Sequence, residues 1–583
     1  MATSPFEALN DPQRQFGHSD LLLELEKWQF LPKGTPGEVE LAADLLGLRL
    51  VARAENNPWG THYGPFASGT RSDGTEFTAP SKEDLIPDLV DMWAARARAA
   101  KHPLLRHRYA DLVWDLSKLL TGKPAGVDFA RLAIDGALET LATDGVKDEI
   151  DAYQVAERAL DLSKSIRDPE RQRAAEQRLA EYELKRAQDL RGGMWGRAFD
   201  ALVLGDSSLN DATKDRLIGE MEGRLARVSN MEHGDSFDPF AAEAAAMRLA
   251  SLYRRRNKAD DFRRVLLKYK DAFVGISKVA SGAIASAWLD EVHAALIQHG
   301  LTKDAQELEP LLRAHGKRSM DELKKVGASI SISQDEIEAV YRSLTSGTTE
   351  DSLLRLADAF IPRREDIERH MRALSTNAPL LARIQIVKTD DEGRKLVSVG
   401  SQESDPEGRL FHHVAEQLKA SVPFLRALLG RAIARVSIDA RLIMTQVRES
   451  PVFVESRYGL IEEGLRLLFA EQHMAAVHVL IPQIEYAIRH LAEIIGVPTL
   501  RRNKQGGLDA RTLDELLKGV AGVLGDEQVL YLRVLLSDRR GWNLRNDVCH
   551  GLLPSEAFGP AMTDRVLHVL LLLTALRPAR ASS

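Results

Sequence analysis

The segment GWNLRNDVCHG, residues 541 to 551, places an arginine, an asparagine and a histidine at fixed spacing. Arg545 carries a permanent, planar guanidinium, a group that can neutralise charge developing on a phosphorus atom. His550 carries an imidazole, and a histidine with an ordinary pKa of about 6.5 can give or take a proton near neutral pH. Together these groups are sufficient to cleave RNA without a metal ion. The ribose 2′-hydroxyl would attack the phosphorus, leaving a 2′,3′-cyclic phosphate, and DNA would be inert.

Spacing alone does not establish this chemistry. An arginine followed by a histidine at similar spacing also occurs at four other places, Arg96 and His102, Arg227 and His233, Arg364 and His370, and Arg466 and His473. Only the C-terminal pair adds an asparagine directly after the arginine and a glycine directly after the histidine. The R-N-x-x-x-H-G string is therefore a moderately specific signal for a functional site.

The same residues also fit the capped end of a helix. Asn546 and His550 are four residues apart and share one helix face, and Gly551 suits the position after the last helical residue. A histidine in the last turn also favours the helix dipole. On an ideal helix Arg545 and His550 point about 140° apart. They would meet only if the helix begins or distorts at residues 541 to 543, or if two chains each contribute one side chain.

The C-terminal segment that carries RNDVCHG resembles the HEPN superfamily (higher eukaryotes and prokaryotes nucleotide-binding), whose helical bundles bear an R-x4-6-H motif. More narrowly, it is similar to the domain family marked by an R-N-x-x-x-H-G string, as in the endoplasmic-reticulum-membrane-associated RNA degradation protein. The earlier stretch IPQIEYAIRHLAEIIG fits as well, because Glu485 and Arg489 form the E-x-x-x-R that backs the motif in this family. The resemblance covers about 120 residues near the C-terminus.

The resemblance implies a metal-independent endoribonuclease whose active sites form at a homodimer interface. In that case Arg545 would stabilise the phosphorane and His550 would act as general acid or base. Asn546 and Asp547 would orient the histidine or the phosphate. Relatives serve bacterial toxin and antiphage defence systems, and some bind RNA or nucleotides without cutting.

Two further assignments accompany the resemblance. Glu485 and Arg489 would hold the end of the motif helix in place, with an exposed ion pair between neighbouring turns as the alternative interpretation. Cys549 is interpreted as a small buried neighbour of the motif rather than a nucleophile.

Composition sets the wider frame. The net charge of −7 over 583 residues gives no global attraction to nucleic acid, so RNA binding needs a local basic site such as RRNK, residues 501 to 504. A single cysteine cannot form an internal disulfide, which favours a cytoplasmic location. No phosphate-binding loop, dinucleotide fingerprint or zinc-protease motif occurs, so we expect no cofactor and no metal.

No membrane segment is expected. The first fifteen residues lack a basic segment followed by an apolar core, so we expect no signal peptide. The longest apolar run, from Val566 to Leu576, is about half of the ~20 residues that a membrane span requires. We predict that this run forms a buried helix.

Hydrophobic periodicity predicts a mainly α protein. Four regions are expected: an N-terminal helical domain (1–125) with an irregular loop at 56–81, a solenoid-like region of helical hairpins (126–316), a middle domain (317–450) and a HEPN-like bundle (451–583). The middle domain should hold a β-hairpin near 383–399, where apolar and polar residues alternate on either side of DDEG.

Two other functions remain open from the sequence. The chain could be a non-catalytic dimeric scaffold whose helical pairs, including the stripe around Trp288, bind a protein partner. It could also be a regulator that binds RNA or nucleotides without cleavage.

Overall fold

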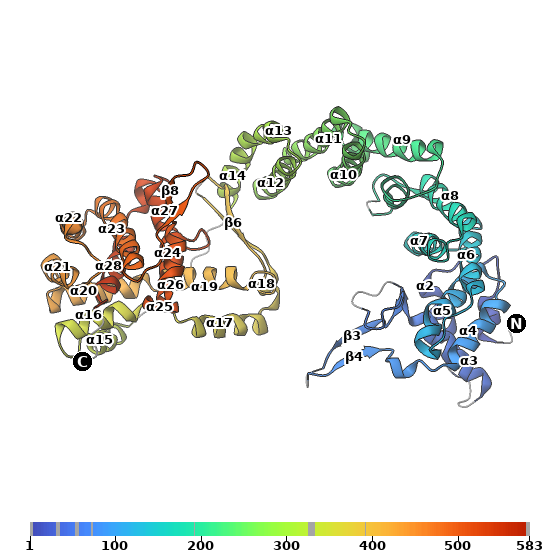
Figure 1. Cartoon of the computed structure of the whole chain (residues 1–583), viewed down its shortest axis with the longest axis horizontal. Helices are drawn as coiled ribbons and strands as arrows, with labels where there is room; N and C mark the ends of the chain where they lie inside the picture. The colour runs from blue at the N-terminus through green and yellow to red at the C-terminus, as the bar shows by residue number, and fades with distance from the viewer. Residues whose placement is uncertain are drawn as a thin grey trace. The chain divides into compact units, whose positions relative to one another are not determined.

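The chain is mainly helical, as predicted. The structure, a computed structural model, describes residues 4–28, 30, 35–52, 57–71, 74–191, 193–323, 333–390 and 392–578. These residues form 28 α-helices and four two-stranded antiparallel sheets (Figure 1). The chain divides into two compact units, Met1–Leu312 and Arg313–Ser583.

The N-terminal unit is a succession of helices in which each member from α4 to α12 packs on the next along the chain (Figure 1). This order is the one expected for solenoid-like helical pairs. The helices of this unit and the one that crosses its boundary are α1 (Pro5–Leu9), α2 (His18–Glu26), α3 (Pro36–Arg49), α4 (Asp88–Ala99), α5 (Pro103–Thr121), α6 (Val127–Ala142), α7 (Glu149–Ser165), α8 (Pro169–Arg186), α9 (Asp211–Val228), α10 (Pro239–Arg255), α11 (Ala259–Ser277), α12 (Gly282–Gln298), α13 (Thr302–Gln306) and α14 (Glu309–Glu322).

The boundary predicted at residue 125 lies within a single core. One apolar cluster extends from Phe6 to Leu217 and includes the fully buried rings of Trp93 and Tyr109. A second cluster extends from Trp195 to Leu308. Because α5 and α6 bury their apolar faces against each other, the chain continues through residue 125 without a break between domains.

The region predicted as an irregular loop at 56–81 contains strands in its described part. After β1 (Val51–Ala52), the chain forms β2 (Tyr63–Gly64), β3 (Ala67–Thr70) and β4 (Glu76–Ala79). β1 pairs with β2, and β3 pairs with β4. The hairpin β3–β4 was missed because its residues, apart from Phe77, lack the large apolar side chains that signal a strand.

The C-terminal unit shares one apolar core that extends from Ile337 to Leu573, so the division predicted at residue 450 also lies within a core. Its remaining helices are α15 (Gln334–Leu344), α16 (Thr349–Ala359), α17 (Arg364–Asn377), α18 (Pro379–Arg383), α19 (Pro406–Ala420), α20 (Val422–Val436), α21 (Ala440–Glu449), α22 (Tyr458–Phe469), α23 (His473–Ile494), α24 (Leu513–Gly519), α25 (Ala521–Leu524), α26 (Asp526–Leu532), α27 (Leu544–Cys549) and α28 (Pro560–Thr574).

Helix α28 is the centre of this unit. Every residue from Met562 to Thr574 is buried, because α16, α20, α21 and α23 all pack against the helix. A helix enclosed on all sides must be apolar around most of its circumference. The prediction of a buried helix is therefore confirmed for Val566 to Thr574, whereas Ala575 and Leu576 follow the helix and are half-buried. No helix in the described ranges is long and apolar enough to cross a membrane.

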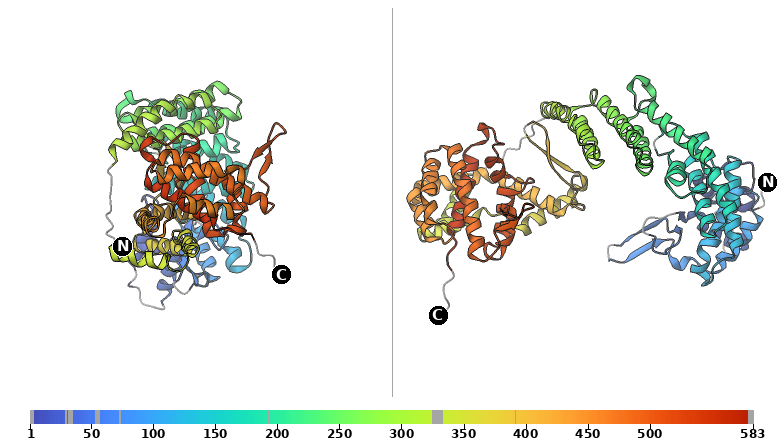
Figure 2. Two further views of the ribbon diagram at one scale, coloured as in Figure 1. Left: turned by 90° about the vertical axis from the view of Figure 1, so that its left-hand side faces the viewer. Right: turned by 45° about the horizontal axis from the view of Figure 1, so that its top comes forward.

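Two β-hairpins complete the unit. The predicted hairpin near 383–399 is present as β5 (Ile386–Thr389) paired with β6 (Lys395–Val399), and Asp391 of its turn lies outside the described residues. The segment from 497 to 510, which reads as a polar loop, forms a second hairpin of β7 (Leu500–Arg502) and β8 (Leu508–Ala510). This second hairpin projects from the helices (Figure 2, left).

Candidate functional site

A pocket of about 510 Å³ lies where α23, α27 and the end of β8 meet. Of the six residues predicted from the motif and its resemblance, five line it: Glu485, Arg489, Arg545, Asn546 and His550. The structure thus brings together two stretches that are about sixty residues apart in the sequence. The other lining residues are Ala510, Arg511, Thr512, Leu513, Asp514 and Ser537.

The motif helix α27 is short, and its start next to Arg545 allows one chain to bring both motif side chains to the pocket. Asn543 has a φ of 55° and interrupts the helical path, so α27 starts at Leu544 and Arg545 lies in its first turn. His550 follows the last helical residue with φ −96° and ψ 2°. Because the helix has only six residues, the side chains at its two ends border the same pocket. A second chain is not needed to bring them to one cavity.

The loop before α27 is held by three separate elements. The Trp542 backbone N–H donates to the Val534 carbonyl at 2.7 Å, and its indole N–H donates to the Ala415 carbonyl of α19 at 3.3 Å. The Lys388 ammonium of β5 donates to the carbonyls of Arg539 and Gly541. These bonds determine the direction in which the motif helix starts.

The end of α27 is capped as a helix end should be. Gly551 has a φ of 65°, and its N–H donates to the Val548 carbonyl at 3.2 Å. The Leu552 N–H donates to the Asp547 carbonyl at 2.9 Å. The interpretation of the motif as a capped helix end is therefore correct for the backbone. The His550 side chain nevertheless remains exposed at the pocket, so the cap does not exclude a chemical role.

Arg545 is held in a bidentate ion pair with Glu485. Its Nε donates to Oε2 at 2.6 Å and its Nη2 to Oε1 at 3.3 Å, while its Nη1 donates to the Asn546 side-chain oxygen at 3.0 Å. A guanidinium has five N–H groups, so one on each terminal nitrogen stays available. The pairing orients the guanidinium and leaves it two donors for a ligand.

Asn546 and Asp547 orient the helix start. The Asn546 amide donates to the Ser537 carbonyl at 3.2 Å and to the Asn543 side chain at 2.7 Å. Asp547 accepts from the Asn543 amide at 2.6 Å and does not line the pocket. Burial raises the pKa of Asp547, although its bond to Asn543 and the nearby Lys388 act in the opposite direction.

Arg489 connects the pocket to the β7–β8 hairpin. Its Nη2 donates to Glu485 Oε1 at 3.2 Å and to the Arg511 carbonyl at 3.1 Å, and its Nη1 donates to the Thr499 carbonyl at 3.3 Å. Both members of the Glu485–Arg489 pair are mostly buried, with side chains 15% and 19% exposed. The alternative of an exposed surface pair is therefore wrong. Arg489 ties both ends of the hairpin to α23.

The β7–β8 hairpin and the residue that follows it carry cations that the R-N-x-x-x-H-G motif does not include. Arg511 follows β8 and lines the pocket, and Asp514 beside it is paired with Arg533 at 2.7 Å. Arg502 and Lys504 form no ion pair with any carboxylate in the described ranges. In the sequence, the basic run RRNK was the signal for these cations. Only the folding of the β7–β8 hairpin places that run on the element next to the pocket.

Cys549 is exposed, which corrects the prediction that it is a buried neighbour. It lies in the last turn of a helix that is open to solvent on this side. Partial burial of the sulfur raises the pKa of the thiol, so the group stays protonated at neutral pH and is a poor nucleophile.

Comparison with known proteins informs only the N-terminal unit. A family model described as a domain of unknown function, DUF7380, matches residues 39–175. No curated protein and no solved structure matches the chain. The matched range lies outside the pocket around Arg545.

Proposed function

We propose that the chain is a metal-independent endoribonuclease that uses the 2′-hydroxyl of its RNA substrate as nucleophile. One observation carries the proposal: Arg545 and His550 line the same pocket, and His550 is exposed to it. The pocket has more cations than carboxylates, since Arg489, Arg511 and Arg545 line it with Glu485 and Asp514. Such a pocket favours a phosphodiester.

The reaction assigns one role to each group. The O2′–phosphorus bond forms and the phosphorus–O5′ bond breaks, which leaves a 2′,3′-cyclic phosphate and a free 5′-hydroxyl. The two unbonded N–H groups of Arg545 face the extra negative charge on the non-bridging oxygens. His550 either takes the proton from O2′ or delivers one to O5′.

A homodimer through the C-terminal unit would complete the site. One imidazole serves one of the two proton transfers directly, and the second copy would bring a second His550 for the other. This arrangement is part of the proposal, as are a cytoplasmic location and a role in bacterial defence or a toxin-type stress response.

The β7–β8 hairpin supports binding of the RNA strand. Arg501, Arg502 and Lys504 are exposed on a projecting element whose two ends are fixed to the pocket by Arg489. Cations on such an element can contact successive phosphates without reading sequence. They also supply the local positive charge that the overall charge of −7 lacks.

The test is cleavage of a single-stranded RNA in EDTA by the full-length protein, with analysis of the product ends. We expect cyclic phosphate ends, no cleavage of the matched DNA, and a loss of about 10²- to 10⁴-fold in rate for His550→Ala. His478→Ala, an exposed histidine on α23, is the matched control and should keep the wild-type rate. Equal rates for wild type, Arg545→Ala and His550→Ala, or no cleavage at all, would contradict the proposal.

Binding without cleavage is the second candidate. The observation that favours it is the engagement of Arg545 by Glu485, because three of its five N–H groups are already used. In this case RNA would bind and remain intact, and Arg545→Ala would weaken binding while His550→Ala would not. The dimeric scaffold is distinguished by the absence of RNA binding altogether.

A further inference from the structure

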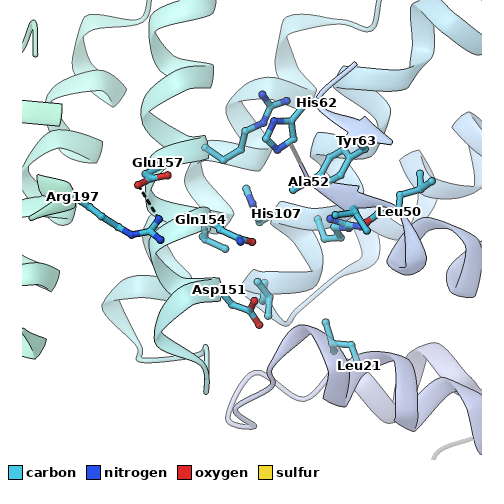
Figure 3. A pocket seen from close by; sticks show the side chains of 15 residues that line it. Leu21, Leu50, Ala52, His62, Tyr63, His107, Asp151, Gln154, Glu157 and Arg197 are labelled. Atoms are coloured by element: carbon cyan, nitrogen blue, oxygen red, sulfur yellow. Dashed lines mark hydrogen bonds and ion pairs between the residues drawn. The ribbon is translucent and has the colours of Figure 1, made fainter. Parts of the chain in front are cut away.

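The N-terminal unit contains a cavity of about 370 Å³ between α2, the β1–β2 pair, α5 and α7 (Figure 3). This size is in the lower range of small-molecule pockets. Most of its lining residues belong to the range matched by the family model, residues 39–175. Apolar side chains, including Leu21, Leu50 and Val155, form much of its wall.

Two carboxylates outside the lining, Asp111 and Asp115, hold the polar part of the wall in place. Asp111, whose side chain is fully buried, accepts from Arg158 Nη2 at 2.7 Å and from the Tyr63 hydroxyl at 2.8 Å. Asp115 accepts from the backbone N–H groups of His62 and Tyr63 at 3.0 and 2.8 Å. Both carboxylates lie on α5 and tie β2 to that helix. The cavity therefore exists without a ligand to hold it open.

The arginines around the cavity all have partners. Arg158 is paired with Asp111, and Arg197 is paired with Glu157 at 3.2 Å. Burial alone would raise the pKa of Asp111, but Arg158 outweighs it and brings that pKa to about 2, so the carboxylate is charged. The third arginine, Arg108, donates to the carbonyls of Gly47 and Leu50 at the C-terminal end of α3, where the helix dipole is negative. Asp151 and Glu157 are the carboxylates of the lining, whereas Asp111 and Asp115 contact lining residues without lining the cavity themselves. The three arginines are met by four carboxylates, Asp111, Asp115, Asp151 and Glu157, so no surplus positive charge is left to attract an anion.

Two polar groups face the cavity with hydrogen-bonding capacity to spare. His107 Nδ1 donates to the Ala133 carbonyl at 2.9 Å, and because a carbonyl only accepts, the proton is on Nδ1. Its Nε2 is then an acceptor, and burial lowers the pKa of this histidine so that it stays neutral. The Gln154 amide of α7, which can donate and accept, forms no hydrogen bond with the described residues. Figure 3 shows Gln154 and His107 on neighbouring walls of the cavity.

We propose that this cavity binds an uncharged, flat heterocycle that presents a hydrogen-bond donor beside an acceptor, the chemical class of nucleobases and nucleosides. The donor of such a ligand would meet His107 Nε2, and its acceptor would meet the Gln154 amide. The apolar walls would cover its faces. An anionic small molecule fits less well, because the carboxylates around the cavity outnumber its three arginines.

The test uses the full-length protein with adenosine, guanosine, cytidine and uridine as probes, in thermal shift and calorimetric titrations. At least one nucleoside should bind saturably and raise the melting temperature. Ala52→Trp, which fills the cavity, should abolish binding. Ala174→Trp, the same change at an exposed position of α8, should leave it unchanged. Gln154→Leu should weaken binding about tenfold.

Three results would overturn the proposal. The first is saturable binding by none of the four nucleosides. The second is binding that survives Ala52→Trp and is lost in Arg545→Ala, because the ligand would then occupy the C-terminal pocket. The third is binding of the 5′-monophosphates but not of the nucleosides. In that case an arginine that contacts the phosphate, rather than His107 and Gln154 at the base, would decide recognition. None of these readouts depends on RNA cleavage.

Discussion

The ion pair between Glu485 and Arg545 should couple the two helices of the candidate site, and a double-mutant cycle measures that coupling. The four proteins are wild type, Glu485→Gln, Arg545→Ala and the double variant. Exposed ion pairs contribute about 0.2 to 1 kcal/mol, and breaking a buried pair costs about 3 to 5 kcal/mol. The two side chains here are 15% and 28% exposed, between those limits, and their contact is bidentate. We therefore expect a coupling free energy of about 2 kcal/mol.

Urea unfolding can be followed specifically in the C-terminal unit. Trp542 is the only tryptophan between residues 313 and 583, so the ¹⁹F resonance of 5-fluorotryptophan at this position reports on that unit alone. Trp542→Phe assigns the resonance. The control cycle is Glu463→Gln with Arg466→Ala on α22, a bidentate pair at 2.8 and 2.6 Å whose side chains are 50% and 58% exposed. Its coupling should be much smaller. A coupling below about 0.5 kcal/mol for Glu485 and Arg545 would refute the argument that partial burial strengthens this pair.

Three further predictions concern the same unit. Gly551→Ala should lower the free energy of unfolding by about 1 kcal/mol, because its φ of 65° strains any residue with a Cβ. The control is Gly522→Ala, inside α25 with open space around it, which should not destabilise the protein. Equal effects of the two substitutions would contradict the argument that the positive φ of Gly551 requires glycine. Burial lowers the pKa of His568 to about 3, so the unfolded chain takes up its proton first. Its contribution to stability is complete above pH about 6.5 and falls by at most about 1.4 kcal/mol per pH unit as the pH drops toward 3, and His568→Phe should flatten the acid limb of a urea-midpoint titration. Finally, the double variant Arg502→Ala with Lys504→Ala should lower the slope of log binding constant against log salt for single-stranded RNA by about 1.4, and an unchanged slope would remove the hairpin from the RNA path.

The sequence predicted the secondary-structure elements of this protein better than its domain boundaries. Helical periodicity indicated the mainly α fold, a long apolar run indicated the buried helix α28, and alternation of apolar and polar residues indicated the β5–β6 hairpin. All three features depend on local pattern. The domain boundaries at 125 and 450 depend on which helices share a core, and the cores extend through both positions. The β3–β4 and β7–β8 hairpins were missed for a related reason. Their strands are short, mostly polar and largely exposed, so their pairing leaves little hydrophobic signal in the sequence.

For the candidate site, the residue types were readable from the chain alone. Arg545 and His550 stood out by their neighbours, and Glu485 with Arg489 by their spacing on one helix face. What only the tertiary structure decided is how these groups meet. The start of α27 at Leu544 brings the arginine and the histidine to one pocket, and Arg489 joins that pocket to the basic hairpin. Spacing along a helix is a local property, whereas the loop bonds that orient α27 come from β5 and α19, more than a hundred residues away in the sequence.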